Sequence, residues 1–462
     1  MRAGGTEVNG EEGSGGQGGA FQGFPAEAFR QRRARVFEAL GDGAMVLPAA
    51  SVLHRAGDSE LRYRPDSELF YLTGFVEPDA LLLLRGFADE ARSVLFVRPR
   101  DAKAELWTGS RLGPDPVPSI FGVEEGRSIE QLWDSLPGLL TGADRVFYRL
   151  GVHPRIESLV VAALRTARLR GARRGTGPRG VEDPGEILDE LRLRKDPWEL
   201  EALREATAIT VSGFRNVLPR IEPGLGEWEL EAELEAAFRR EGAAAPSFAT
   251  IVGSGANACV LHYTDNGRRM RDGELVLIDA GAERRMYAGD VTRTLPVSGV
   301  FSPEQADVYR VVESARREAV AAIAPGVPVA DVHQRAVRSL IEGLLGLGVL
   351  SGDPEELIEK GAQAPYFPHR TCHWLGLNTH DVGDYVREGE SRMLEPGMVL
   401  TVEPGLYFPS SLVDDPLGGS AEAFAGIGVR IEDDVLVSEH GREVLTKDLP
   451  TGVEEIEKLV GR

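Results

Sequence analysis

The spacing of apolar residues divides the chain into a strand-rich first part and a second part with paired helices. In the first part, the pattern predicts a helix over residues 26–40 and a helical segment over residues 129–139. Short β-prone runs lie around them, in the sequences AMVLPA, LFYLTGF, ALLLLRG, RSVLFVRP, ELWTG and RVFYRL. Strands interleaved with helices predict a compact α/β domain.

In the second part, helices and strands follow one another in two rounds. Helices are expected from Asp196-Pro197 onward and over residues 228–241, before the strands FATIVGSG and VLHYTD and a hairpin over residues 275–295. Helices over residues 303–324 and 329–345 then precede strands in MVLTVEPGLYF and GIGVRIEDDVLVSE. The repeated order indicates a duplicated half.

Changes in composition predict where the domains begin and end. Residues 1–20 are glycine-rich and almost without apolar side chains, which predicts a disordered tail. Residues 21–171 are expected to form the α/β domain. Residues 172–186 are rich in Gly, Pro and Arg, and a linker is expected over residues 172–195. Residues 196–462 are expected to form the second domain. The predicted fold class is α+β.

Composition limits the kinds of partner. A net charge of −21 argues against sequence-independent nucleic-acid binding, which needs a basic surface. No apolar run approaches the ~18 residues of a membrane span, and no basic start precedes an apolar export segment. The two cysteines have no disulfide or zinc-site spacing, which indicates a reducing compartment, the cytoplasm.

The hairpin LVLIDAGAERRMYAGDVTRTL carries one acid in each arm, Asp279 and Asp290. If its centre lies between Arg284 and Arg285, the two acids are direct cross-strand partners with Cβ atoms ~5 Å apart, where like charges repel. A cation between the carboxylates would remove the repulsion. The alternative is an exposed hairpin with two surface aspartates.

Several further residues of the second part are of types that bind metals. An acid at the end of an apolar strand is costly to bury unless it is paired or coordinated. These candidates are His369, His373, His380, Glu403 and Glu432, and Arg430 lies on the same strand face as Glu432. Carboxylates with a single imidazole favour Mn²⁺ or Zn²⁺, and this many carboxylates suggest two ions ~3.5–4 Å apart. Alternatively, His373 is a core histidine and Glu432 belongs to a solvated acidic run.

Two other motifs are weak candidates. The sequence GSGANA over residues 253–258 loosely matches a dinucleotide-binding loop, but the following VLHYT predicts a strand where that fold needs a helix. Cys372 precedes His373, as in a thiol nucleophile with its base. Neighbouring residues on a strand point to opposite faces, which disfavours that pairing.

Five segments together resemble the Xaa-Pro aminopeptidase (aminopeptidase P) branch of the pita-bread metallopeptidases, family M24. They are SFATIVGSGANACVLHYTDN, LVLIDAGAERRMYAGDVTRTLPVSG, HWLGLNTHDVG, MVLTVEPGLYF and GIGVRIEDDVLV. RYRPDSELFYLTGFVEPDALLLL and ELWTGSRLG resemble the smaller N-terminal domain of that family. The resemblance runs from Phe24 onward and implies a pita-bread catalytic domain over residues 196–462.

The resemblance also implies a role for each matching residue. Asp279 would bind one metal, Asp290 and Glu432 would bridge two, His373 would bind the second, and Glu403 would bind metal and move protons. Substrate binding and stabilisation of the intermediate would fall to His262, His369 and His380, and orientation of the acids to Tyr407 and Arg430. Trp107 matches a position that reaches a neighbouring subunit's site. One departure is Arg370, where the family usually has glycine.

The implied activity is hydrolysis of the bond between an N-terminal residue and a following proline, by attack of a metal-bridging hydroxide. The cofactors would be two divalent ions, Mn²⁺ first, with Zn²⁺ or Co²⁺ possible, in a homodimer or homotetramer. The nearest alternative is prolidase, which shares the ligands and takes only dipeptides. A non-catalytic pita-bread binding module is the remaining alternative, although all five ligand positions are present.

Overall fold

A computed structural model describes residues 23–89, 92–412 and 421–461. The chain divides into two compact units, Met1–Leu191 and Arg192–Arg462. The predicted tail over residues 1–20 lies outside the described residues, and the predicted domain limits stay predictions. In the part of the chain that is described, no helix combines the length and apolar character needed to cross a membrane.

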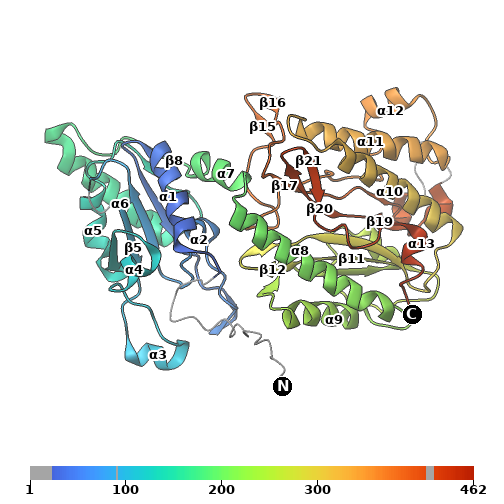
Figure 1. The fold of residues 1–462 in the computed structure, drawn as a ribbon, viewed down its shortest axis with the longest axis horizontal. Coiled ribbons are helices and arrows are strands. Elements are labelled where there is room, and N and C mark those ends of the chain that lie inside the picture. The colour runs from blue at the N-terminus through green and yellow to red at the C-terminus, as the bar shows by residue number, and fades with distance from the viewer. Residues whose placement is uncertain (1–22, 90–91, 413–420, 462) are drawn as a thin grey trace, which may run out of the picture. The chain divides into compact units, whose positions relative to one another are not determined.

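The N-terminal unit is built on a six-stranded sheet covered by helices (Figure 1). In sheet order the strands are β6 (Glu125–Ser128), β5 (Ser93–Val97), β4 (Leu81–Arg85), β1 (Ala44–Pro48), β7 (Val146–Phe147) and β8 (Val181–Glu182). Alternate residues of β1, β4 and β5 form one core with the helices α5 (Leu132–Leu139) and α6 (Pro154–Gly171). Met45, Leu47, Leu82, Leu84, Leu95 and Val97 on the other face are also buried, so these strands are covered on both faces.

The other α-helices of this unit are α1 (Ala26–Leu40), as predicted, α2 (Ser67–Thr73), α3 (Ala102–Thr108) and α4 (Val117–Phe121), and α7 (Gly185–Leu193) runs across the boundary between the units. The prediction of strands at LFYLTGF and ELWTG is wrong. Asp66 and Asp101 accept backbone N–H hydrogen bonds at the starts of α2 and α3, and such caps favour helix. A short apolar run alone does not distinguish the two structures. β2 (His54–Ala56) pairs with β3 (Ser59–Glu60).

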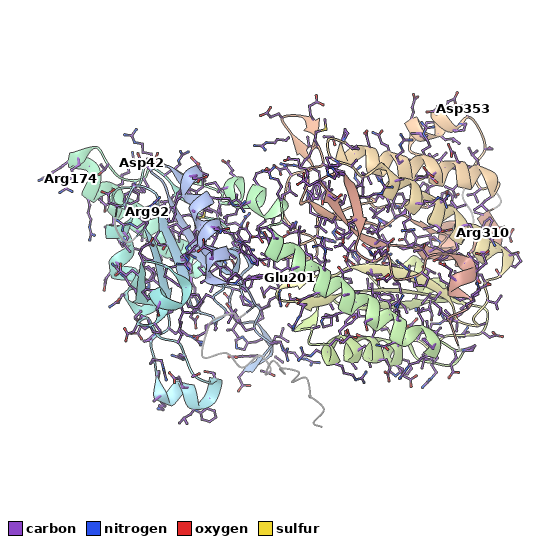
Figure 2. All side chains as sticks on the ribbon, in the orientation of Figure 1. Asp42, Arg92, Arg174, Glu201, Arg310 and Asp353 are labelled. Atoms are coloured by element: carbon purple, nitrogen blue, oxygen red, sulfur yellow. The ribbon has the colours of Figure 1, made fainter. Side chains whose placement is uncertain are left out.

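Two pairs of helices flank the strands of the C-terminal unit (Figure 1). They are α8 (Pro197–Val217) with α9 (Glu227–Arg240), and α10 (Pro303–Ala322) with α11 (Val329–Gly346), close to the predicted spans. Capping boxes begin α8 at Asp196 and α10 at Ser302. The exposed Glu201 and Arg310 lie on the outer sides of α8 and α10 (Figure 2). Two short helices follow, α12 (Pro354–Lys360) and α13 (Val453–Ile456).

The strands of this unit form several small sheets. β10 (Ile251–Ser254), β11 (Leu275–Ala280) and β14 (Val291–Pro296) make the first, and β17 (Val399–Val402), β20 (Asp433–Ser438) and β21 (Gly441–Val444) another. The smaller ones are β9 (Ala245–Pro246) with β12 (Ala282–Arg284) and β13 (Tyr287–Ala288), β18 (Gly405–Tyr407) with β19 (Gly428–Arg430), and β15 (Val386–Arg387) with β16 (Glu390–Ser391). VLHYTD, predicted as a strand, forms turns after a 3₁₀ helix, Gly255–Cys259.

The hairpin over residues 275–295 forms, but with a different register from the predicted one. Asp279 lies opposite Thr292, because the turn is made by Arg285 and Met286, whose φ angles are 53° and 71°. Two positive φ angles are typical of the tight turn that best fits the twist of two strands. The shift is an even number of residues, so Asp279 and Asp290 remain on one face as diagonal neighbours.

A buried ion-pair cluster ties the start of the C-terminal unit to a loop far along the chain. Asp381 binds Arg192 (Oδ1 to Nη2, 2.5 Å) and Lys195 (Oδ2 to Nζ, 3.3 Å), and all three side chains are at most 2% exposed. Burial raises the pKa of Asp381, but the charges of Arg192 and Lys195 outweigh it, so the pKa is lowered. The ionised carboxylate therefore stabilises the folded unit.

We expect Asp381→Asn to lower the free energy of unfolding by about 3 kcal/mol, because it leaves two buried cations without a full counter-charge. Urea denaturation at pH 7 measures this loss. The ionised Asp381 carboxylate contributes this stability above the ordinary aspartate pKa of ~3.9, and the contribution is lost as pH falls below that value. The difference in the free energy of unfolding between variant and wild type therefore shrinks in acid.

Asp384→Asn is the matched control, since Asp384 is exposed in the same loop. We expect it to change stability by no more than about 0.5 kcal/mol. Equal effects of the two substitutions would contradict the assigned role of the cluster.

Candidate metal centre

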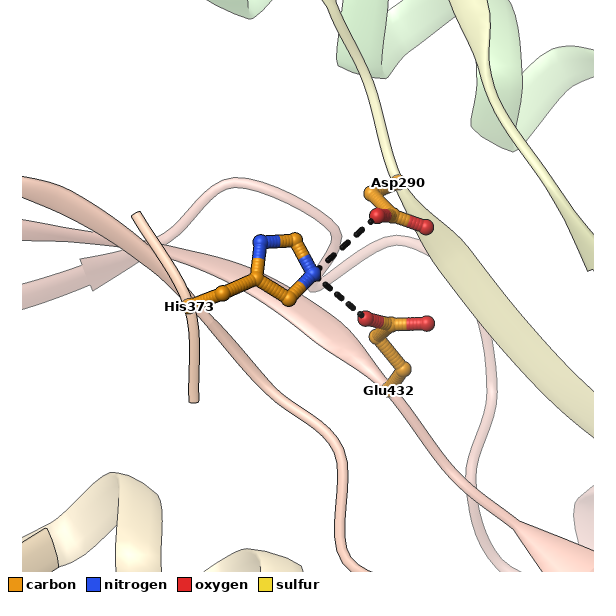
Figure 3. Close-up of side chains that lie close together, drawn as sticks. All are labelled: Asp290, His373 and Glu432. Carbon is orange, nitrogen blue, oxygen red and sulfur yellow. Dashed lines mark ion pairs between the residues drawn. The ribbon is translucent and has the colours of Figure 1, made fainter. Parts of the chain in front are cut away.

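Three segments far apart in the chain bring an imidazole between two carboxylates (Figure 3). Asp290 precedes β14, Glu432 lies between β19 and β20, and His373 precedes the bridge that joins Trp374 to Leu400 of β17. The His373 Nε2 atom lies 3.4 Å from Asp290 Oδ2 and 3.9 Å from Glu432 Oε1. One candidate ligand atom of each residue lies within 4.8 Å of the other two.

The other two predicted ligands line the same cavity, whose volume is about 1070 Å³, outside this closest group. Glu403 follows β17, with Oε1 3.9 Å from His373 Nε2. Asp279 of β11 accepts a 2.6 Å hydrogen bond at Oδ2 from Arg430 Nη2. Its Oδ1 atom is buried, and none of the described residues donates to it. A buried carboxylate oxygen without a donor suits a cation.

The orientation of His373 also suits metal binding. Its Nδ1 atom lies 3.1 Å from the Trp374 carbonyl oxygen, which can only accept, so Nδ1 carries the proton. The Nε2 lone pair then faces the carboxylates. Burial lowers the pKa of His373 to about 4, aided by the charge of His380, so the ring is neutral at pH 7. A neutral imidazole held through its other nitrogen is a typical metal ligand.

The carboxylates destabilise one another in the absence of a cation. Burial raises the pKa of Asp290 and of Glu432 well above the usual range, and neighbouring carboxylates add to both shifts. Burial also raises the pKa of Glu403 to about 8, although the charge of Arg430 opposes the shift. Oxygen donors with one imidazole are the ligand set of Mn²⁺, Zn²⁺ and similar ions. The residues present therefore fit divalent metal.

Polar residues around the carboxylates hold them in place. Arg430 Nη1 donates to the Tyr407 hydroxyl (2.9 Å), and that hydroxyl lies 2.9 Å from His369 Nε2. His262, His369 and His380 line the cavity, and the rings of His373 and His380 are 4.3 Å apart. The structure thus gathers the predicted site residues of this unit at one cavity. Trp107 belongs to α3 of the other unit.

Two supporting residues were absent from the sequence prediction. Thr292 donates to Glu432 Oε2 (2.7 Å) and accepts from Arg430 Nε (3.1 Å). The backbone N–H of Asp290 donates to Asp434 Oδ2 at 3.3 Å. Thr292 could have been found, since it lies two residues after Asp290 and thus on the same strand face. Asp434 looked like part of a surface acidic run, but it is fully buried.

The two weak candidates gain no support. β10 leads into a five-residue 3₁₀ helix, so the GSGANA loop has no α-helix N-terminus for a phosphate. Cys372 does not lie on a strand, contrary to the expectation. Burial raises its thiol pKa well above the usual value, so the reactive thiolate is disfavoured.

Comparison with known proteins agrees with this geometry. Residues 201–439 match Metallopeptidase family M24, and residues 29–148 match the aminopeptidase P N-terminal domain. The fold and the site together define a metallopeptidase of family M24, and membership in that family implies divalent metal ions. The predicted α+β fold, with a C-terminal pita-bread domain and a smaller α/β domain, is confirmed.

Relatives over nearly the whole chain place it more narrowly. It is 42% identical to the Xaa-Pro aminopeptidase of Escherichia coli, over 94% of this chain and 97% of that one. A Pseudomonas aeruginosa aminopeptidase structure matches with a TM-score of 0.89, 41% identity and 94% and 98% coverage. Aminopeptidase P from Escherichia coli with the inhibitor Pro-Leu matches with a TM-score of 0.87, 42% identity and the same coverage. The chain therefore belongs to the Xaa-Pro aminopeptidase branch of the family.

The repulsion between these carboxylates predicts that Asp290→Asn changes stability in opposite directions in the absence and in the presence of metal. In metal-free protein at pH 7, Asp290→Asn should raise the free energy of unfolding. An acid whose pKa is raised in the folded state opposes folding at every pH above the ordinary pKa of that acid. Mn²⁺ at about 100 times its Kd should stabilise wild type by ~2.7 kcal/mol, and the variant should lose most of this gain. Chemical denaturation of metal-free and Mn²⁺-loaded protein measures both.

Asp307→Asn serves as the control, because Asp307 is exposed on α10 beside Arg310. It should keep the full response to metal. An undiminished response in Asp290→Asn would exclude Asp290 as a ligand.

Proposed function

We propose that this chain removes the first residue from peptides that carry proline at the second position, using two divalent metal ions. The observation that carries the proposal is the convergence of Asp290, His373 and Glu432 at one cavity, in a chain of this family. Together with Asp279 and Glu403, these three residues would hold the two ions. Mn²⁺ is the metal proposed first, with Zn²⁺ or Co²⁺ as substitutes.

When bound, such ions lower the pKa of water to give a nucleophile at neutral pH and polarise the scissile carbonyl. Glu403 lines the cavity with Oε1 3.9 Å from His373 Nε2, so its carboxylate is placed beside the ligand cluster. It would take the proton from the attacking water and pass it to the proline nitrogen as the peptide bond breaks. The carboxylates also attract the free N-terminal amine of the substrate, which restricts cleavage to the first bond.

The histidines on the cavity wall would bind the substrate backbone. Burial and the charge of Arg430 lower the pKa of His369 to about 4, so it acts as a neutral ring beside Tyr407. His262 and His380 would donate hydrogen bonds to the developing oxyanion and to the proline carbonyl. Because a proline at the second position has no N–H, recognition must use carbonyl oxygens and shape.

We further propose that the protein works in the cytoplasm as a homodimer or homotetramer. Both cysteines are free thiols, in keeping with a reducing compartment. On α3, Leu106 and Trp107 are 85% and 86% exposed, an unusual position for two large apolar side chains. A second copy of the chain would cover them, with Trp107 beside that copy's cavity.

A panel of peptides tests the activity against the prolidase alternative. With Mn²⁺, the purified protein should release the first residue from tripeptides and longer peptides that begin Xaa-Pro, and should leave Xaa-Ala peptides intact. Mass spectrometry of the products measures this. Cleavage confined to Gly-Pro and other dipeptides would make the protein a prolidase instead.

Two variants connect the activity to the centre. Asp290→Asn should reduce kcat/KM by about 10³-fold, or ~4 kcal/mol of transition-state stabilisation, because a shared ligand is lost. Cys372→Ser, next to His373, should retain activity, since the thiol has no role. Loss of activity in Cys372→Ser, with activity retained in Asp290→Asn, would support a thiol nucleophile instead.

The exposed α3 residues predict an effect on assembly. Trp107→Ala should raise the subunit dissociation constant by about 30-fold, the ~2 kcal/mol typical of a central tryptophan in an interface. Sedimentation across a dilution series measures it. Trp133→Ala, which alters a 61%-exposed tryptophan of α5, is the control. Identical sedimentation of wild type and Trp107→Ala would remove α3 from the proposed interface.

A further inference from the structure

Arg370 is a cation at the cavity that the chemistry described above does not use. It lies three residues before His373, is exposed, and lines the same cavity as the metal ligands. Its backbone carbonyl is held by His369 Nδ1 at 2.8 Å, which fixes the backbone at this point. Within the described residues, its guanidinium makes no hydrogen bond or ion pair. It is therefore available to a ligand.

The charges around the cavity make Arg370 distinctive. Every carboxylate in the lining belongs to the candidate metal centre, and the other arginine there, Arg430, is bound to Asp279. Burial lowers the pKa of His333, on α11, to about 4, and the positive charge of the nearby Arg370 adds to the shift. His333 is thus neutral and is held by Thr371 Oγ1 at 2.8 Å. Arg370 carries the only unpaired permanent positive charge on the described lining.

Part of the wall of this cavity is apolar. Val329 and Ala330 begin α11, and Val386, which is 59% exposed, lies on β15. These groups offer no competing anion. A guanidinium has five N–H donors in a plane and matches a carboxylate with two parallel hydrogen bonds. A peptide held at the metal centre extends along the cavity, so its own carboxylates can reach such a group.

We infer that Arg370 forms a carboxylate-binding subsite that makes this aminopeptidase prefer substrates with a negative charge outside the proline. This inference rests on the proposed function. The carboxylate has two possible sources, the free C-terminus of a short peptide and the side chain of Asp or Glu. Because Arg370 is exposed, the gain is that of a solvent-accessible ion pair, roughly fivefold in kcat/KM.

Matched peptide pairs measure the preference. Xaa-Pro-Ala with a free C-terminus is compared with its C-terminal amide, and Xaa-Pro-Glu amide with Xaa-Pro-Gln amide. Each pair is assayed with Mn²⁺-loaded wild type, Arg370→Gln, Arg370→Lys and Arg370→Glu. We expect wild type to favour the charged member of at least one pair by roughly fivefold, mainly through KM. The pair that responds identifies the source of the carboxylate.

The ratio between pair members should fall to about one in Arg370→Gln, persist in part in Arg370→Lys, and reverse in Arg370→Glu. Added salt should reduce it in wild type, as for any exposed ion pair. Arg310→Gln removes one exposed arginine outside the cavity and should leave the ratio unchanged. If both ratios are the same in wild type and Arg370→Gln, the subsite does not exist.

Failure of this inference differs from failure of the proposed function. If wild type cleaves the amidated peptides but neither ratio depends on Arg370, the aminopeptidase activity stands and the subsite is refuted. If no Xaa-Pro peptide of any charge is cleaved with any of the divalent metals, the proposed function fails, and the subsite with it.

Discussion

The C-terminal unit is arranged around carboxylates that repel one another in a buried site. Asp279 lies on β11, and Asp290, Glu403 and Glu432 lie at the ends of other strands. Burial of a charge is costly unless a counter-charge is near. The packed helices and strands hold these groups in place, so the free energy of folding offsets the repulsion. Divalent ions would remove this repulsion, so metal binding would stabilise the folded unit.

Arg430 determines how much of that repulsion the protein itself relieves. Through its three nitrogen atoms it reaches Asp279, Thr292 and Tyr407, and Thr292 in turn donates to Glu432. One cation cannot neutralise four carboxylates. The same side chain orients the acids and leaves room for metal, which a fully paired cluster could not do.

Local features were predictable from sequence, and features set by distant contacts were not. α1 and α8 to α11 follow from the periodicity of their apolar residues, and α8 and α10 also from the capping boxes that begin them. The carboxylates were recognisable because acids at the ends of apolar strands are rare. The hairpin register depended on positive φ angles at Arg285 and Met286, which are not residues that usually mark such turns. The proximity of Arg370 and His333 arises only from packing of α11 against a later loop.

The buried cluster at Asp381 has a consequence for synthesis of the chain. Arg192 and its partner Asp381 are separated by 189 residues, so Arg192 is synthesised long before the carboxylate that it binds. At ~5–20 residues per second, that interval is roughly 10–40 s on the ribosome. His380, which lines the cavity, is made just before Asp381, so this part of the cavity wall and the last member of the cluster are synthesised together. Until Asp381 is synthesised, the emerging unit cannot form this buried cluster.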